Sequence, residues 1–107
     1  MKRFMLMLVA VVGFFLAVNA AVVFRSTQSL CNGTEQIILR SNGTFELYDD
    51  GVSVYAGKYS IDRSTGSNVI ELYVEDNTLR CTFNYKSDRM NISSLTFRGN
   101  VYRPCGR

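Results

Sequence analysis

Residues 78–86 alternate strictly between apolar and polar side chains, which indicates a β-strand with one buried face. Every second residue from Leu79 to Tyr85 is apolar, and the residues between them are polar. No segment after Phe24 carries the 3.6-residue apolar period of an amphipathic helix. The chain must therefore bury its apolar side chains with strands alone.

Turn signals divide the rest of the chain into further short strands. Asn42-Gly43, Asp49-Asp50-Gly51, Asp76-Asn77 and Gly99-Asn100 are sequences that favour tight turns. The strands expected between the turns are residues 34–40, 44–48, 52–62, 69–75, 78–86, 90–98 and 101–103, with 22–25 as one further candidate.

Two of these strands change parity along their length. Val54 is even-numbered, whereas Tyr59 in the same strand is odd-numbered. A β-bulge shifts the alternation by one residue, and a Gly inside a strand often marks one. We therefore predict a bulge near Ala56-Gly57. A similar slip between residues 92 and 95 predicts a second bulge near Ser93-Ser94.

Seven or eight short strands joined by tight turns form an antiparallel meander. Because no helix is available to cover the apolar face, the sheet must close into a small barrel or fold over on itself. Closure also removes the exposed strand edges that invite aggregation. We predict an all-β fold in which residues 21–107 form a single β-barrel-like domain after an N-terminal signal helix.

Residues 1–20 have the features of a secretory signal peptide. Met1-Lys2-Arg3 is basic, residues 4–18 are apolar or Gly, and Val18-Asn19-Ala20 is a small-residue cleavage site. We expect cleavage after Ala20 and export to the periplasm, the cell surface or the medium. The alternative is an uncleaved membrane anchor, because residues 4–24 are long enough to span a bilayer.

Export places the three cysteines in an oxidising compartment. Cys81 alternates with core residues, so we expect a buried, inert thiol there. Cys31 and Cys105 lie outside the strongest strand patterns, and we expect a disulfide between them, although the two pairings with Cys81 stay open. A bridge that closes about 75 residues contributes about 4.5 kcal/mol in the chain-entropy model.

The chain has no His, which removes histidine-based triads, Cys-His dyads, histidine general bases and His-ligated zinc. Three widely spaced Cys do not match a zinc pattern either. Asp49-Asp50 and Glu75-Asp76 could hold calcium or act as acid and base, but no calcium-loop spacing accompanies them, so we interpret them as turn residues. We expect no cofactor, no metal and no enzymatic activity.

Charge is unevenly distributed in the mature chain. Residues 21–77 carry 4 basic and 8 acidic side chains, whereas residues 78–107 carry 6 basic and 1 acidic. The basic residues of the second half, which include Arg89 and Arg107, are candidates for an anion-binding face. The interpretation that we favour is a solvated face on which the two halves attract each other across the sheet. Tyrosine is common at recognition surfaces, so we include tyrosines with the basic residues. The candidate binding surface comprises Tyr48, Tyr73, Arg80, Lys86, Arg98, Tyr102 and Arg103.

Three segments carry a resemblance to a known group of proteins. They are Asn42-Gly43-Thr44-Phe45, residues 57–62 (Gly-Lys-Tyr-Ser-Ile-Asp) and residues 97–102 (Phe-Arg-Gly-Asn-Val-Tyr). With these motifs, residues 34–103 resemble the small lipocalin-like β-meander domains of exported bacterial proteins of the Bacteroides type. The resemblance implies a curved or barrel-like sheet and an envelope or secreted location, and it implies no catalytic residues. The early Gly-x-Trp of full lipocalins is missing, because the chain has no Trp.

These observations favour an exported, non-enzymatic binding or recognition domain in the cell envelope or outside the cell. The expected partner is a protein or an anionic envelope glycan; we expect no nucleic acid, and membrane contact only through an uncleaved signal. The main alternative is a protein inhibitor of an extracellular hydrolase, by analogy with other small disulfide-bonded β-barrels. An envelope enzyme is the third hypothesis.

Overall fold

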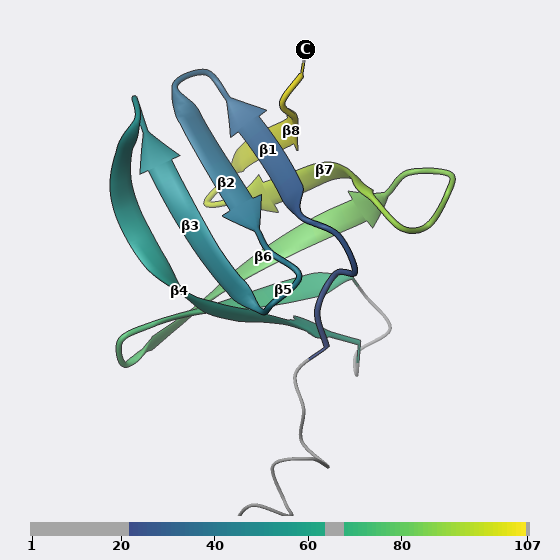
Figure 1. The fold of residues 1–107 in the computed structure, drawn as a ribbon, viewed down its shortest axis with the longest axis horizontal. Helices are drawn as coiled ribbons and strands as arrows, with labels where there is room; N and C mark the ends of the chain where they lie inside the picture. The colour runs from purple at the N-terminus through teal and green to yellow at the C-terminus, as the bar shows by residue number, and fades with distance from the viewer. Residues whose placement is uncertain (1–21, 64–67, 107) are drawn as a thin grey trace, which may run out of the picture.

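Eight strands follow one another in the part of the chain that the structure describes, and each pairs antiparallel with the next. The computed structural model describes residues 22–63 and 68–106, so the predicted signal peptide lies outside the described residues. The last strand pairs with the first, which closes the sheet into a barrel rather than a folded-over sheet (Figure 1). The strands are β1 (Gln28–Asn32), β2 (Glu35–Leu39), β3 (Thr44–Asp49), β4 (Val52–Asp62), β5 (Val69–Val74), β6 (Asn77–Tyr85), β7 (Ile92–Phe97) and β8 (Asn100–Pro104).

The predicted all-β meander is therefore confirmed in the described part of the chain. Every strand sends at least one apolar side chain inward, so the barrel interior is a packed core. β6 contributes Cys81 and Phe83 from the alternating segment, and β8 contributes Tyr102. No helix among the described residues has the length and apolarity needed to cross a membrane.

The seam between β1 and β8 has the fewest paired positions in the barrel. Only Leu30↔Pro104 and Cys31↔Arg103 are paired there, whereas β1 and β2 pair at five positions. Pro104 has no N–H and cannot donate to the ladder. Just beyond the paired residues, the Cys105 N–H donates to the Ser29 carbonyl at 3.0 Å. The seam therefore has less ladder pairing than the other pairs of neighbouring strands.

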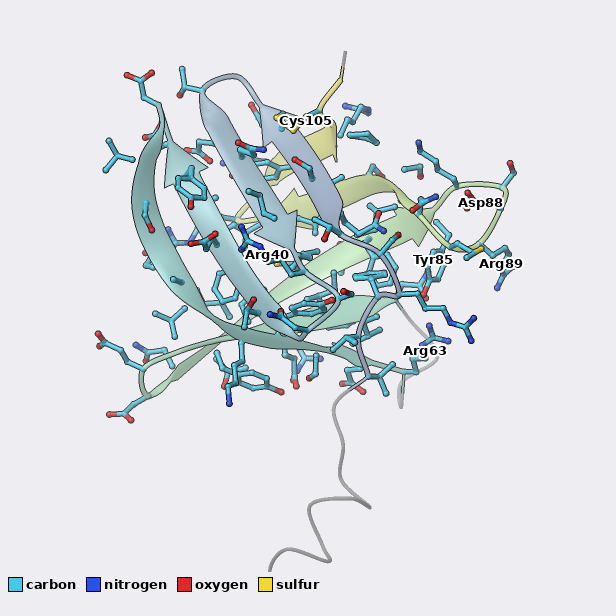
Figure 2. All side chains as sticks on the ribbon, in the orientation of Figure 1. Arg40, Arg63, Tyr85, Asp88, Arg89 and Cys105 are labelled. Atoms are coloured by element: carbon cyan, nitrogen blue, oxygen red, sulfur yellow. A yellow bond between two sulfur atoms is a disulfide. The ribbon has the colours of Figure 1, made fainter. Side chains whose placement is uncertain are left out.

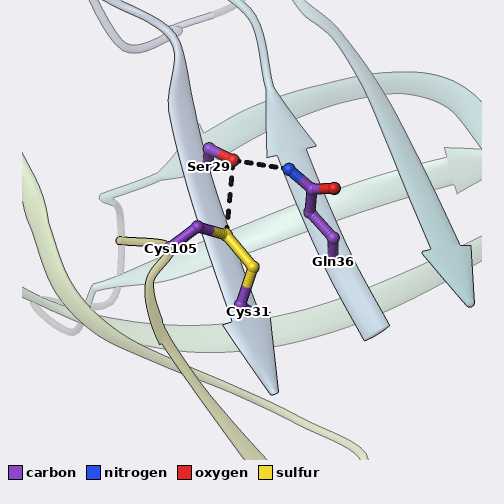
Figure 3. The surroundings of a disulfide bond; sticks show 4 residues. All are labelled: Ser29, Cys31, Gln36 and Cys105. Carbon is purple, nitrogen blue, oxygen red and sulfur yellow. Dashed lines mark hydrogen bonds between the residues drawn. A yellow bond between two sulfur atoms is a disulfide. The ribbon is translucent and has the colours of Figure 1, made fainter. Parts of the chain in front are cut away.

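A disulfide between Cys31 and Cys105 crosses this seam (Figure 3), which confirms the expected pairing. The two Cα atoms lie 5.0 Å apart, and 74 positions separate the residues in the sequence. The hydroxyl of Ser29 contacts the Cys105 sulfur at 3.4 Å and accepts a hydrogen bond from the Gln36 amide at 2.8 Å. The bridge thus joins the first strand to the last.

The free thiol of Cys81 lies inside the barrel, as expected. Burial raises the pKa of this thiol to about 12. Because the thiolate is the reactive form, Cys81 is inert toward exchange with the bridge.

The second predicted bulge is confirmed, but the first was placed wrongly. The β6–β7 register shifts so that Ser93 is the extra residue, as the parity slip indicated. In β4, Leu47 faces Tyr55 and Tyr48 faces Ser53, which makes Val54 the extra residue instead of Ala56-Gly57. Val54 is 50% exposed and does not enter the core.

Gly57 marks a close approach of two strands rather than a bulge. A Cβ atom on Gly57 would lie 2.1 Å from the Tyr73 carbonyl oxygen of β5 and 3.3 Å from the ring of Phe45. Only glycine fits where a neighbouring backbone comes this close. This contact point is where β4 leaves β3 as its main partner and begins to pair with β5.

The chain entering the barrel also differs from expectation. Residues 22–25 do not form a strand, and the extra strand is β1, further along the chain. The entry segment instead lies over one end of the barrel, where the Val22 carbonyl accepts a hydrogen bond from the Ile61 N–H at 2.8 Å. Phe24 is buried in the core. The segment is apolar because Phe24 packs into the end of the barrel, and not because the segment is a strand of the sheet.

We predict that Cys31→Ser lowers the melting temperature of the mature chain by several degrees or more, because it removes up to about 4.5 kcal/mol of loop-closure stabilisation. Differential scanning calorimetry measures the shift. Cys81→Ser is the matched control: peptide mapping should still find the Cys31–Cys105 bridge. A bridge that contains Cys81 in the native protein would reject the seam assignment.

Candidate functional site

The meander places its connections alternately at two ends of the barrel. The β2–β3, β4–β5 and β6–β7 connections and the entry segment 22–27 lie at one end, which we call the arginine end. The β1–β2, β3–β4, β5–β6 and β7–β8 connections lie at the other, which we call the acidic end. Residues that are distant in sequence are thereby sorted by the end at which they fall.

Charge follows this sorting. At the arginine end, the connections and entry segment carry five basic side chains and one acidic side chain, Asp88. At the acidic end, the connections carry three acidic residues and one basic residue, Arg98, with Glu35 and Asp49 next to them. The two ends of the barrel therefore carry opposite net charge, and the positive end attracts anions.

A cavity of about 270 Å³ opens at the arginine end. Arg25 from the entry segment, Arg63 from the end of β4 and Arg89 from the β6–β7 connection line it. Figure 2 shows Arg63, Tyr85 and Arg89 gathered at this end of the molecule. We call this cavity the arginine pocket; its remaining lining residues are Val23, Phe24, Ile61, Tyr85 and Met90.

Strand alternation explains how Arg63 reaches the pocket. Tyr59 and Ile61 of β4 point into the core, and Arg63 continues the same face one step beyond the buried layer. Its guanidinium donates a hydrogen bond to the Tyr85 hydroxyl at 2.7 Å. Asp62, on the opposite face, points away toward Arg80 at 3.6 Å.

Aromatic rings form the floor of the pocket. The ring of Phe24 packs edge-on against Phe83, with 5.4 Å between centroids, and against Tyr85, with 6.3 Å. Phe83 and Tyr85 are themselves 5.0 Å apart. Met90 is 55% exposed at the rim. The pocket thus combines cationic walls with an apolar base.

The three pocket arginines lack acidic partners within the described chain. Among residues 22–63 and 68–106, the ion pairs are Arg40–Glu46 and the contacts of Arg80 with Asp62 and Glu71. Arg40, at the same barrel end, is neutralised by Glu46 at 2.6 Å. Arg25, Arg63 and Arg89 therefore present uncompensated positive charge beside one cavity.

Two polar anchors hold the segments that form the pocket. The buried Tyr59 hydroxyl accepts from the Phe24 N–H at 3.0 Å and donates to the Arg40 carbonyl at 2.8 Å, which fixes the entry segment. Burial raises the pKa of Tyr59, while its bond with Phe24 opposes this shift. The buried Gln28 side chain accepts from the Ile92 N–H at 2.9 Å and donates to the Asn91 side chain at 3.1 Å.

The β6–β7 connection is shaped by Asp88. Its carboxylate accepts from the backbone N–H groups of Met90 and Asn91 at 2.8 and 3.1 Å. These backbone hydrogen bonds, the Met90 bond first, lower the pKa of Asp88. Its negative charge is thus engaged within the loop that carries Arg89.

The structure does not gather the predicted binding surface into one patch. Tyr73 and Arg80 are brought together on the outer face through Glu71, whose carboxylate accepts from the Tyr73 hydroxyl at 2.9 Å and from Arg80 at 2.7 Å. Tyr48 lies on the outer face of β3, where a hydrogen bond with Glu46 raises its pKa. The ion pairs of Arg80 with Asp62 and Glu71 match the interpretation that the two halves of the chain attract each other.

The other basic residues of that surface are separated. Lys86 begins the β6–β7 connection at the arginine end, whereas Arg98 lies in the β7–β8 turn at the acidic end. Arg98 stacks on Tyr55 and Phe97, 5.3 and 5.1 Å from the ring centroids. Arg103 is exposed on β8 beside the disulfide seam.

Tyr102 was predicted to lie on the binding surface, and this prediction is wrong. It is 1% exposed and points into the barrel, because its position in β8 pairs with the inward-facing Leu95. Its hydroxyl donates a very short hydrogen bond to the Glu35 carboxylate. Burial, followed by this contact with Glu35, raises the pKa of Tyr102. Its ring is therefore not available to an external partner.

Sequence reasoning included Arg89 in the basic patch but missed Arg25 and Arg63. Both belong to the acidic half of the chain, so their charge was hidden in a net-negative segment. The inward parity of Tyr59 and Ile61 was a signal that could have revealed Arg63. Arg25 could not be found this way, because residues 22–25 were themselves expected to form a strand.

The chemistry available at the pocket is binding of an anion. Arginine guanidinium groups recognise carboxylates and phosphates with paired hydrogen bonds. Within residues 22–63 and 68–106, no three His, Cys, Asp or Glu side chains gather closely enough to hold a metal ion. Comparison of the chain with known proteins finds no matching family model, no similar curated protein and no similar solved structure.

We predict that Tyr59→Phe destabilises the mature chain by about 1–3 kcal/mol, because the Phe24 N–H and the Arg40 carbonyl lose a buried partner. Urea denaturation monitored by circular dichroism measures the loss. Tyr73→Phe is the control, since its hydroxyl is exposed and should change stability by less than about 0.5 kcal/mol. Equal effects of the two substitutions would contradict the anchoring role of Tyr59.

Proposed function

We propose that this chain is an exported, non-catalytic domain that binds a small anion at the arginine end of its barrel. The observation that carries the proposal is the arginine pocket, in which Arg25, Arg63 and Arg89 surround one cavity without acidic partners in the described chain. Like charges held close together repel each other, and an anionic ligand relieves that repulsion. The excess of basic side chains at the arginine end also attracts anions over a longer range.

Export is part of the same proposal. The Cys31–Cys105 disulfide is compatible with an oxidising compartment. The basic, apolar and small-residue order of residues 1–20 supports cleavage after Ala20. Up-and-down barrels are used by many ligand-binding proteins, which is also the expectation from the lipocalin-like resemblance. The pocket lies at a barrel mouth, where ligand sites of such proteins commonly occur.

We expect amide signals of the arginine pocket to shift in NMR spectra of the mature chain when mixtures of small organic anions are added. Neutral mixtures of the same size should leave them unchanged. A triple variant with Arg25→Gln, Arg63→Gln and Arg89→Gln should lose the response. The matched control, Arg80→Gln with Arg103→Gln, removes two outward-facing arginines and should keep it. A response that is the same in both variants, or an exported protein that retains Met1, would contradict the proposal.

The alternative of a hydrolase inhibitor has one observation in its favour. Val52 and Val54, near the β3–β4 turn, are 65% and 50% exposed. β4 pairs with β3 from Val52 onward but with β5 only from Lys58. An exposed strand edge can bind an extended segment of another protein.

This alternative predicts that stoichiometric mature chain inhibits a secreted hydrolase and that Val52→Lys with Val54→Lys abolishes the inhibition. The assay is residual activity across a panel of extracellular proteases and glycosidases. If the wild type and the double variant act alike, or neither inhibits any enzyme, the alternative fails and the anion-binding proposal is unaffected.

A further inference from the structure

The arginine pocket is amphiphilic, which narrows the class of ligand beyond an anion. Its polar side chains are hydrogen-bond donors: three guanidinium groups and the Tyr85 hydroxyl. That hydroxyl accepts from Arg63, and its own proton is donated to no acceptor among the described residues. A ligand headgroup rich in acceptors therefore fits these walls, and a cationic headgroup does not.

The apolar residues that line the pocket favour a ligand that also has an apolar group. Phe24 and Ile61 are buried in the core, but Val23 and Tyr85 are only partly buried and Met90 is 55% exposed beside the cavity. An inorganic anion without an apolar group would leave the apolar surfaces of Val23, Tyr85 and Met90 in contact with water. An apolar group attached to the headgroup would cover them, and each methylene buried in this way is worth about fourfold in affinity.

The size of the cavity limits the apolar part. At about 270 Å³ it lies just below the range of about 300–1,000 Å³ that holds drug-sized ligands. The barrel interior beneath it is filled by core side chains, so a long chain cannot thread inward. The ligand must be short.

We infer that the arginine pocket binds a small amphiphilic anion: a carboxylate or phosphate headgroup held by Arg25, Arg63 and Arg89, with a short apolar body against Val23, Tyr85 and Met90. This inference rests on the proposed function and specifies the ligand of the same site. Both headgroups fit the planar fork of arginine, so the shared chemistry is an acidic group on a short hydrocarbon or ring.

Isothermal titration calorimetry of the disulfide-bonded mature chain tests the inference with five probes. They are octanoate, octyl phosphate, acetate, inorganic phosphate and the neutral octanamide. We expect octanoate or octyl phosphate to bind at least tenfold more tightly than acetate, inorganic phosphate and octanamide. The better of the two amphiphiles identifies the preferred headgroup.

Three variants, one of them a control, separate the headgroup contacts from the apolar contacts. Arg63→Gln should weaken the amphiphiles and the simple anions, and Arg103→Gln, on the outer face of β8, should weaken none. Met90→Ser should weaken the amphiphiles severalfold and leave acetate and phosphate unchanged. Its exposure lets the side chain change without disturbing the core.

The outcomes distinguish this inference from the proposed function. Equal affinities for octanoate and acetate, with loss in Arg63→Gln, would overturn the amphiphilic ligand and leave an anion-binding domain. Equal affinities for octanoate and octanamide would overturn the headgroup role of the arginines. No binding of any probe at millimolar concentration would reject both.

Discussion

The closure of the barrel at the β1–β8 seam is the contact on which the rest of the structure depends. Two paired positions, one of them occupied by Pro104, give this seam fewer ladder positions than any other pair of neighbouring strands. Hydrogen bonds from the Cys105 N–H to the Ser29 carbonyl and from the Asn32 side chain to the Val101 carbonyl add to the ladder. The Cys31–Cys105 bridge stabilises the seam further from the outer face, while Leu30 packs inward from the same strand. A closed sheet then has one interior, and every strand contributes to a single core.

Closure also determines where function can lie. The interior is filled, so a ligand has access only at the ends or on the outer face. At the arginine end, the entry segment crosses the opening of the barrel, and the Phe24 ring fills that opening. The Tyr59 hydroxyl holds the segment in place through its hydrogen bond with the Phe24 N–H. Arg25, Arg63 and Arg89 then surround a shallow cavity over an aromatic floor. At the opposite end, Arg98 stacks on Tyr55 and Phe97 beside a cavity of about 150 Å³, and Glu35 and Asp49 line the same cavity.

The sequence was sufficient for the fold class and the meander order, because alternation and turn residues are local signals. It favoured the pairing of Cys31 with Cys105 but left the two pairings with Cys81 open, and the structure decides between them. The sequence failed where a local signal has two physical causes. Gly57 could mean a bulge or a close strand contact, and only the packed neighbour at Tyr73 decides between them. Tyr102 was assigned to the surface because one short strand gives no clear parity. The arginine pocket was hidden because it joins three segments that only the closed barrel brings together.

The central claim is that β1 and β8 close the barrel and that the entry segment plugs its arginine end. Nuclear Overhauser contacts in the disulfide-bonded mature chain test this most directly. We predict contacts across the seam between Cys31 and Arg103, together with contacts between the rings of Phe24 and Phe83, whose centroids are 5.4 Å apart. A first strand without contacts to the last, or a Phe24 ring without aromatic neighbours, would contradict the account.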